Sequence, residues 1–212
     1  MVDNYFVDNF EPPPMFPAAK SERFETERLL MGRIIEDDLD ALTPILQGQD
    51  VTEMFGRDRP IDPPAFISDA IVAWEANRSW NFTITEKSSH GVVGYLGMTL
   101  EVRGGGGEGW QAEPAIVISA DFRCQRYGEE AMRGLIAWTF AELECPPGVT
   151  LDEVRAACRP ENTASLRLLE RLADIGMRDL GEQEVSVKNS SSGKPSSMPA
   201  RIFGITREEY EQ

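Results

Sequence analysis

Histidine and cysteine are scarce in this sequence of 212 residues, which contains one histidine and three cysteines. The cysteines, Cys124, Cys145 and Cys158, are odd in number and form no C-x-x-C pair. Zinc sites take most of their ligands from these two residue types, so His90 and three dispersed thiols argue against such a site, and we expect no bound metal. The shortage of cysteine also argues against a disulfide framework and favours a reducing compartment.

Long apolar segments are also missing. No apolar run approaches the roughly 20 residues that a helix needs to cross a bilayer. The first ten residues, MVDNYFVDNF, have no basic start and no continuous apolar core, so they do not resemble a secretory signal. We therefore expect a cytoplasmic protein without a membrane partner.

Positive charge is in deficit, because 21 Lys and Arg face 36 Asp and Glu, which gives a net charge of −15 at pH 7. Such a surface repels nucleic acid and anionic lipid headgroups, which argues against both as partners. It attracts cations, so the charge serves either solubility alone or the steering of an amine or a basic peptide. The apolar fraction of 41% is ordinary for a globular chain, and the length fits one domain with a tail.

Proline, glycine and serine mark the boundaries of that domain. Residues 1–22 contain four prolines among polar residues and predict an extended arm without a core, followed by a single domain at 23–212. The low-complexity segment 189–199 lies between two strand-like runs and predicts a flexible hairpin loop. The glycine-rich run 104–109 is followed by no helix, which favours a hairpin tip over a phosphate loop.

Apolar periodicity predicts alternating strands and helices between these loops. Asp37 or Asp38 is expected to cap the first helix. The order of elements predicts an α/β domain with a mixed sheet. The expected strands are at 28–34, 80–87, 92–101, 113–119, 154–158, 177–188 and 200–206, and the expected helices are around 39–46, 66–74, 129–143 and 163–173.

Three short motifs follow one another along the chain. They are FETERLLMGRI, from Phe24, the pair Glu130-Ala131, and RPENTASLRLLERLADIGM, which contains Asn162-x-x-Ser165. The first two are similar to the TERLxLR opening and the EA pair of the ribosomal-protein N-terminal acetyltransferase (RimJ/RimL-like) branch of the GNAT family of N-acetyltransferases, and the third is similar to that family's NxxSxxxxxKxGF. The resemblance covers roughly residues 24–210.

The resemblance implies a mixed, mostly antiparallel central sheet flanked by about four helices. It also implies that the chain transfers an acetyl group from acetyl-CoA to a primary amine. Three classes stay open: an acetyltransferase of peptide or protein N-termini, an acetyltransferase of small amines, and a degenerate, non-catalytic acyl-CoA-binding protein. The sequence does not give the oligomeric state.

The segment Arg123-Cys124-Gln125-Arg126-Tyr127-Gly128 aligns with the family's pyrophosphate loop, Arg/Gln-x-x-Gly-x-Gly/Ala. A strand that turns into a helix N-terminus presents free N–H groups and the positive end of the helix dipole to phosphates. The first and last positions fit the pattern, but Arg126 replaces the central glycine. With a negative φ, Arg126 could aim its guanidinium at a phosphate. Alternatively, it blocks the loop and the protein is the degenerate one.

Acetyl transfer needs a base, because an amine is protonated at neutral pH. The resemblance places Glu113 where the branch has the proposed base, the glutamate of AEIGY, at the start of the strand that leads to the loop. Pro114 departs from that pattern, and the alternative is a solvated glutamate at a strand edge. His90 is expected in an exposed turn and is not chosen.

The resemblance implies the rest of the site. The cofactor's pantetheine arm lies along Asn162 and a strand segment, and the hydroxyl of Ser165 lies near the sulfur as a candidate acid. Tyr127 is a less favoured acid. An alternative interpretation is that Asn162 and Ser165 only cap their helix. The strand segment comprises Ile116, Val117, Ile118 and Ser119.

Overall fold

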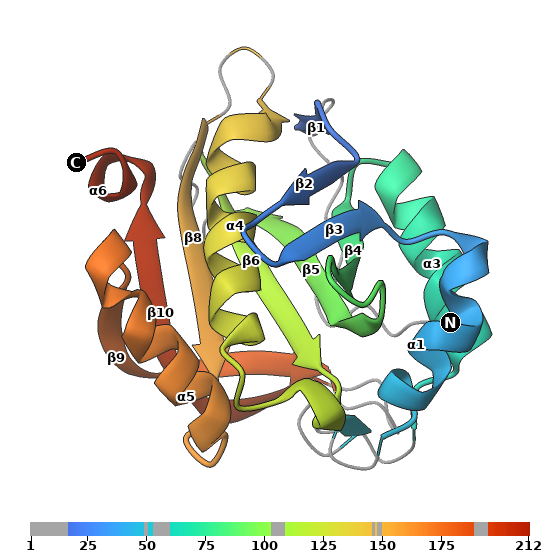
Figure 1. Ribbon diagram of the computed structural model, residues 1–212. Helices are drawn as coiled ribbons and strands as arrows, with labels where there is room; N and C mark the ends of the chain where they lie inside the picture. Colours follow the sequence, from blue (N-terminus) through green and yellow to red (C-terminus); the bar gives the residue numbers. More distant parts are fainter. Residues whose placement is uncertain are drawn as a thin grey trace.

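The structure is a computed structural model that describes residues 17–48, 51–52, 60–102, 109–145, 147, 150–188 and 195–212. Within these residues, eight strands form one sheet in the order β2-β3-β4-β5-β6-β8-β10-β9, and β1 pairs with β7 in a second, small sheet (Figure 1). Among the described strands of the large sheet, only the β6–β8 pair is parallel. The predicted mixed, mostly antiparallel sheet is confirmed. The strands are β1 Ala18–Ala19, β2 Arg23–Glu25, β3 Leu29–Arg33, β4 Ser79–Glu86, β5 Val92–Val102, β6 Gly109–Ile118, β7 Leu143–Glu144, β8 Thr150–Cys158, β9 Arg178–Lys188 and β10 Pro195–Thr206.

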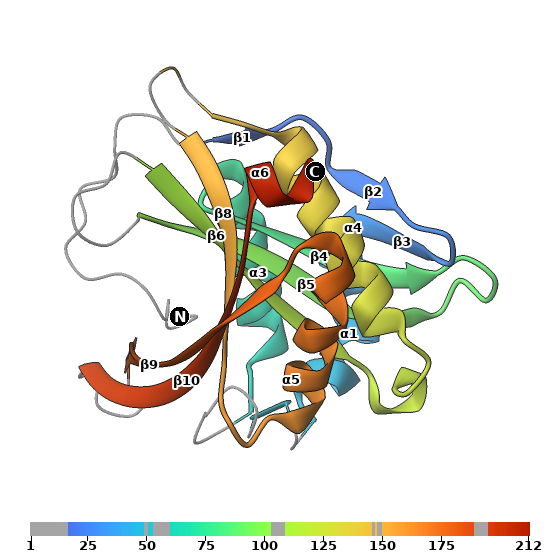
Figure 2. The ribbon, with the colours of Figure 1, turned by 90° about the vertical axis from the view of Figure 1, so that its left-hand side faces the viewer.

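Helices cover both faces of this sheet (Figures 1 and 2). Side chains alternate along β6, so Ile116 and Ile118 pack with the larger core cluster beneath α4, whereas Val117 packs with the smaller cluster beneath α1 and α3. None of the helices in the described part of the chain is long and apolar enough to cross a membrane. The helices are α1 Leu39–Leu46, α3 Pro63–Glu75, α4 Tyr127–Glu142, α5 Thr163–Glu170 and α6 Arg207–Tyr210, with 3₁₀ turns η1 Glu36–Asp38, η2 Ala120–Phe122 and η3 Arg171–Ile175.

The predicted periodicity matches the observed burial. Phe82 and Ile84 on β4 are fully buried, and Ile67 and Trp74 form part of the buried face of α3. The β4–β5 hairpin is present as predicted, with His90 exposed in its turn at a φ of 58°.

Other predicted boundaries and caps need correction. Asp38 occupies the N-cap position of α1, as predicted, but its side chain makes no capping hydrogen bond to that helix. Its carboxylate instead accepts hydrogen bonds from the backbone of Ile35 at 3.0 Å and from the hydroxyl of Thr83 at 2.8 Å. It therefore closes the preceding turn and ties that turn to β4. Strand β6 begins at Gly109, so Glu113 lies in the middle of the strand rather than at its start.

The predicted loops coincide partly with strands. Strand β10 begins at Pro195, so the end of the predicted 189–199 loop is paired with β9, while 189–194 lies outside the described residues. Most of the glycine-rich run also lies outside them, but the pairing of Val102 with Trp110 confirms the hairpin that it connects. Of the predicted N-terminal arm, residues 1–16 lie outside the described part, and Ala18–Ala19 pairs with β7.

Candidate active site

The parallel strands β6 and β8 pair along only part of their length. Their pairing ends at Ala112 and Val154, beyond which β6 follows β5 and β8 follows β10, so the two strands separate (Figure 1). Among the described strands, none pairs with the β8-facing edge of β6 beyond Ala112. Strand β6 leads to α4 and β8 leads to α5, so helix N-termini follow both sides of the opening. Such termini present backbone N–H groups without intrahelical partners.

Two charged residues stand where the strands separate. Glu113 on β6 and Arg155 on β8 directly follow the last paired residues, and their charges interact. The carboxyl of Glu113 forms a hydrogen bond with that of Glu101 on β5. Oε2 of Glu101 accepts a hydrogen bond from the Gln111 amide at 3.2 Å. Oε1 of Glu101 is buried, and when both carboxyls are ionised it has no hydrogen-bond donor among the described residues. A proton on Glu113 supplies the donor that Glu101 lacks.

The environment of this carboxyl pair favours retention of that proton. Burial raises the pKa of Glu113 to about 8, assisted by the charge and hydrogen bond of Glu101 and opposed by Arg155. Burial also raises the pKa of Glu101, against the hydrogen bonds from Gln111 and Glu113. Adjacent carboxyls resist joint ionisation, so the pair is expected to hold one proton at neutral pH. A carboxylate with a raised pKa accepts protons more strongly than an ordinary glutamate does.

The loop that follows β6 enters α4 through left-handed backbone. Cys124 has a φ of 61° and Arg126 a φ of 64°, so the prediction of a negative φ at Arg126 is wrong. A residue with a Cβ adopts this conformation at a cost of about 1 kcal/mol or more. Arg126 is the N-cap residue of α4, but its side chain makes no cap hydrogen bond. That side chain is exposed and forms no ion pair with any carboxylate in the described residues, so it is available to an anion.

The other predicted loop residues lie close to the opening. Arg123 is held against the end of β6, where its Nε donates to the carbonyl of Ile118 at 3.0 Å. At Gly128, a Cβ would come within 2.9 Å of the Leu168 side chain, so glycine lets the first turn of α4 pack against α5. The exposed side chain of Gln125 donates to the carbonyl of Asp121 at 3.4 Å.

Across the opening, Asn162 is the N-cap of α5 and accepts a hydrogen bond from the backbone N–H of Ser165 at 3.1 Å. The predicted capping role of Asn162 is therefore confirmed. The side chain of Ser165 forms a hydrogen bond with the thiol of Cys158, whose pKa is raised by burial and lowered by that bond, with a net increase. Cys158 is buried and packs in the core.

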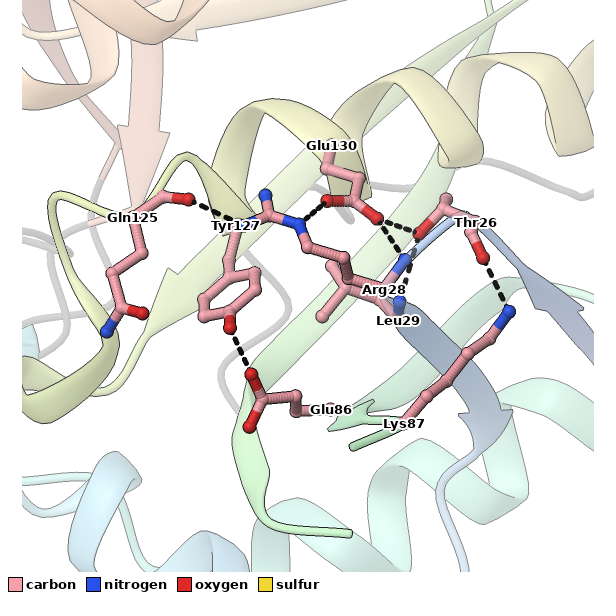
Figure 3. Close-up of polar contacts among 8 residues, drawn as sticks. All are labelled: Thr26, Arg28, Leu29, Glu86, Lys87, Gln125, Tyr127 and Glu130. Atoms are coloured by element: carbon pink, nitrogen blue, oxygen red, sulfur yellow. Dashed lines mark hydrogen bonds and ion pairs between the residues drawn. The ribbon is translucent and has the colours of Figure 1, made fainter. Parts of the chain in front are cut away.

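The structure places Tyr127 in a different polar cluster (Figure 3). Its hydroxyl donates to the carboxylate of Glu86 at the end of β4, and its ring lies 4.4 Å from the Arg28 guanidinium carbon. The hydrogen bond to Glu86 raises the pKa of Tyr127, which makes the phenol a poorer proton donor. The Tyr127 hydroxyl already donates to Glu86, so Ser165 stays the preferred candidate acid.

Sequence reasoning missed three charged residues of this region. Arg28 lies inside the TERL motif, which served only to recognise the family and the first strand. Glu101 and Arg155 occur on correctly predicted strands. The hairpin of β5 and β6 was expected. The contact between the Glu101 and Glu113 side chains depends on the register of the two strands, and the glycine-rich connection does not reveal that register.

Comparisons with known proteins agree with this architecture. Residues 28–173 match the family model described as an acetyltransferase (GNAT) domain. The chain is 24% identical over 195 residues to the uncharacterized N-acetyltransferase p20 of Bacillus licheniformis, covering 89% of this chain and 98% of p20. It resembles the structure of Mycobacterium smegmatis RimJ in complex with CoA-disulfide, with a TM-score of 0.67 and 18% identity over 93% of each chain. It also resembles Vibrio cholerae spermidine N-acetyltransferase in complex with CoA and spermine, with a TM-score of 0.66 and 11% identity over 88% of this chain and 100% of that one.

The family match covers more than half of the sequence and extends from the start of β3 into η3. It includes the separating strands, the loop before α4 and the cap of α5. The solved structures share the fold over nearly the whole chain. The chain therefore belongs to the GNAT family of acetyltransferases.

Proposed function

We propose that this chain transfers an acetyl group from acetyl-CoA to a primary amine, with Glu113 as general base and Ser165 as the candidate acid. The observation that supports this most directly is the position of Glu113. It lies where β6 and β8 begin to separate, and its carboxyl is paired with that of Glu101. Its raised pKa matches the task, because a general base works best when its pKa lies near the operating pH.

The described residues fit acetyl-CoA, which supplies the acetyl group as an activated thioester when bound. The N-terminus of α4 has no side-chain cap, so its first N–H groups are open to the phosphates. Arg123 and Arg126 add positive charge there. The proposed contacts of the pantetheine arm are the open edge of β6 at Ile116–Ile118, Ser119 just beyond the strand, and the cap residue Asn162.

Two proton transfers complete the proposed mechanism. The ionised carboxylate of Glu113 accepts a proton from the ammonium group of the acceptor, which frees the nitrogen lone pair to form the new C–N bond. As the C–S bond breaks, Ser165 donates its hydroxyl proton to the departing sulfur, and it recovers the second proton that the acceptor nitrogen releases on becoming an amide, while Glu113 passes its proton to solvent. Glu101 and Arg155 act on Glu113 in opposite directions: the carboxyl of Glu101 favours the protonated form of Glu113, and the guanidinium of Arg155 favours its ionised form.

The charge of the protein, rather than its fold, favours an acceptor that is itself positively charged. The two structural neighbours named above are a RimJ and a spermidine acetyltransferase, and their TM-scores are nearly equal, so the fold does not choose between peptide and polyamine acceptors. Both kinds of acceptor carry an ammonium group. The net charge of −15 and the carboxyl pair favour a cationic acceptor in either class.

The test is release of CoA thiol from acetyl-CoA in the presence of spermidine or of peptides with free N-termini. Wild type is expected to transfer acetyl to at least one of these amines, and the Glu113→Gln variant to lose that activity. Glu208→Gln is a matched control, because Glu208 is an exposed carboxylate on α6. Binding of acetyl-CoA without transfer to any amine would favour the degenerate, non-catalytic class.

A further inference from the structure

The first turn of α4 is tied to the start of β3 by one carboxylate. Glu130 accepts hydrogen bonds from the Thr26 hydroxyl at 2.5 Å, from the Arg28 backbone N–H at 2.7 Å and from Arg28 Nε at 2.6 Å (Figure 3). Burial raises the pKa of Glu130, but these hydrogen bonds and the charge of Arg28 outweigh that effect and the net pKa is lowered. The carboxylate therefore stays ionised and acts as a fixed anchor for the guanidinium.

The anchored guanidinium also contacts the loop that precedes α4. Arg28 Nη1 donates to the backbone carbonyl of Gln125 at 3.1 Å. Gln125 lies between Cys124 and Arg126, both of which have left-handed backbone. Such backbone is strained in a residue with a Cβ, and strained backbone persists only where surrounding contacts hold it. The bond from Arg28 thus acts on the residue that lies between the two strained positions.

The guanidinium of Arg28 also stacks over the ring of Tyr127, the first residue of α4. Because the Tyr127 hydroxyl is bonded to Glu86, the ring cannot shift without breaking that bond. One arginine thus contacts the loop carbonyl, the first helical residue and a carboxylate one helical turn later. These contacts fix the direction in which the open N–H groups of α4 point.

We propose that Arg28 is a positioning residue for the phosphates of acetyl-CoA, which it serves by holding the 123–128 loop and the N-terminus of α4 in their binding conformation. The inference rests on the proposed function, which assigns the phosphates to this loop. It implies that Thr26, Arg28 and Glu130 act together, although the guanidinium is the only group of the three that reaches the loop.

A direct contact between Arg28 and a phosphate is the competing explanation, since the side chain of Arg28 is 41% exposed. The two explanations predict opposite effects of Glu130→Gln. If Arg28 binds phosphate itself, removal of a neighbouring negative charge strengthens CoA binding. If Arg28 positions the loop, loss of its anchor weakens CoA binding.

The experiment compares CoA with pantetheine, which lacks the phosphates. The dissociation constant of CoA is measured by calorimetry, and that of pantetheine by NMR titration, for wild type, Arg28→Lys and Glu130→Gln. Arg201→Lys is the matched control, because Arg201 Nε donates to the Asp179 carboxylate at 2.9 Å on the β9–β10 hairpin, and its hydrogen bonds and ion pair among the described residues go to Asp179 rather than to the loop. Melting temperatures are recorded for all four proteins.

Arg28→Lys and Glu130→Gln are each expected to weaken CoA binding roughly tenfold, the scale of one lost charge-assisted hydrogen bond, and to leave pantetheine binding unchanged. Tighter CoA binding by Glu130→Gln would overturn the proposal in favour of direct contact. Equal weakening of both ligands would overturn it in favour of a general structural role. A wild-type protein that binds CoA no more tightly than pantetheine would instead remove the phosphate site from the proposed function, and the positioning role with it.

Discussion

The side-chain oxygen of Asn162 accepts a hydrogen bond from the backbone N–H of Ser165 at 3.1 Å, which fixes the first turn of α5 beside the end of β8. This bond uses the oxygen of the amide and leaves its NH₂ group for another partner. One side chain is thus placed both to stabilise the helix and to contact a cofactor.

Substitutions at Asn162 should separate these two roles. Asn162→Ala is expected to lower the free energy of unfolding by about 1 kcal/mol, since the cap is lost, and to weaken CoA binding. Asn162→Asp keeps the acceptor oxygen and should keep stability, but it loses the NH₂ donor and should still weaken binding. Chemical denaturation and CoA titration provide the two measurements. If only stability changes, Asn162 is a cap and no more.

Glu113→Gln is expected to lower turnover by roughly 10²-fold or more with little change in CoA affinity, because the base is lost while its size is kept. In wild type, only the ionised form accepts a proton. Activity should therefore rise with pH and reach a plateau above the pKa of about 8. Rates of thiol release across pH measure both effects, and turnover in Glu113→Gln with the wild-type pH profile would remove Glu113 from the mechanism.

Glu101→Gln should shift this profile toward lower pH. The variant removes the neighbouring charge that disfavours ionisation of Glu113, so the pKa of Glu113 is expected to fall. Activity at slightly acidic pH, as a fraction of the plateau, should then exceed that of wild type. Glu208→Gln makes the same change of net charge at an exposed site and should leave the profile in place. An unshifted profile in Glu101→Gln would show that the two carboxyls are not coupled.

The raised pKa of Glu113 should also make the free energy of unfolding depend on pH. The pKa of Glu113 in the folded protein, about 8, exceeds the ordinary value of 4.5, so the folded state keeps a proton that the unfolded state releases between these values. The free energy of unfolding should therefore fall as pH rises through this window, by at most about 1.4 kcal/mol per pH unit, and level off above it. Urea denaturation of wild type and Glu113→Gln measures the difference in the free energy of unfolding, which should stop changing with pH below 4.5. A constant difference across pH would contradict the raised pKa.

Periodicity predicted the elements well, because it reports burial directly. The alternation that buries Phe82 and Ile84 marks β4, and helical spacing marks the buried face of α3. Prediction failed where one residue could form two different hydrogen bonds. Asp38 was assigned to a helix cap by its position, but the hydroxyl of Thr83, which lies on another element, competes for the same carboxylate.

The candidate site shows the same limit. Arg28 and Glu130 belong to motifs that were each recognised in the sequence, yet the bond between them joins positions 102 residues apart. Neither motif predicts that Arg28 and Glu130 are in contact, because that contact depends on how α4 packs against β2 and β3. The roles of Glu113 and Ser165 stay predictions, since they depend on substrates as well as on the fold.

The last prediction concerns Arg126, whose φ of 64° gives its substitutions separate effects on stability and binding. Arg126→Ala removes the guanidinium and keeps the strained backbone, whereas Arg126→Gly removes both. The glycine variant should therefore be more stable than the alanine variant by about 1 kcal/mol. If the guanidinium binds a phosphate, both variants should bind CoA more weakly than wild type and lose part of the salt dependence of binding. Calorimetric titrations at two salt concentrations and urea denaturation test this, and tighter CoA binding by both variants would identify Arg126 as an obstruction and favour the degenerate, non-catalytic class.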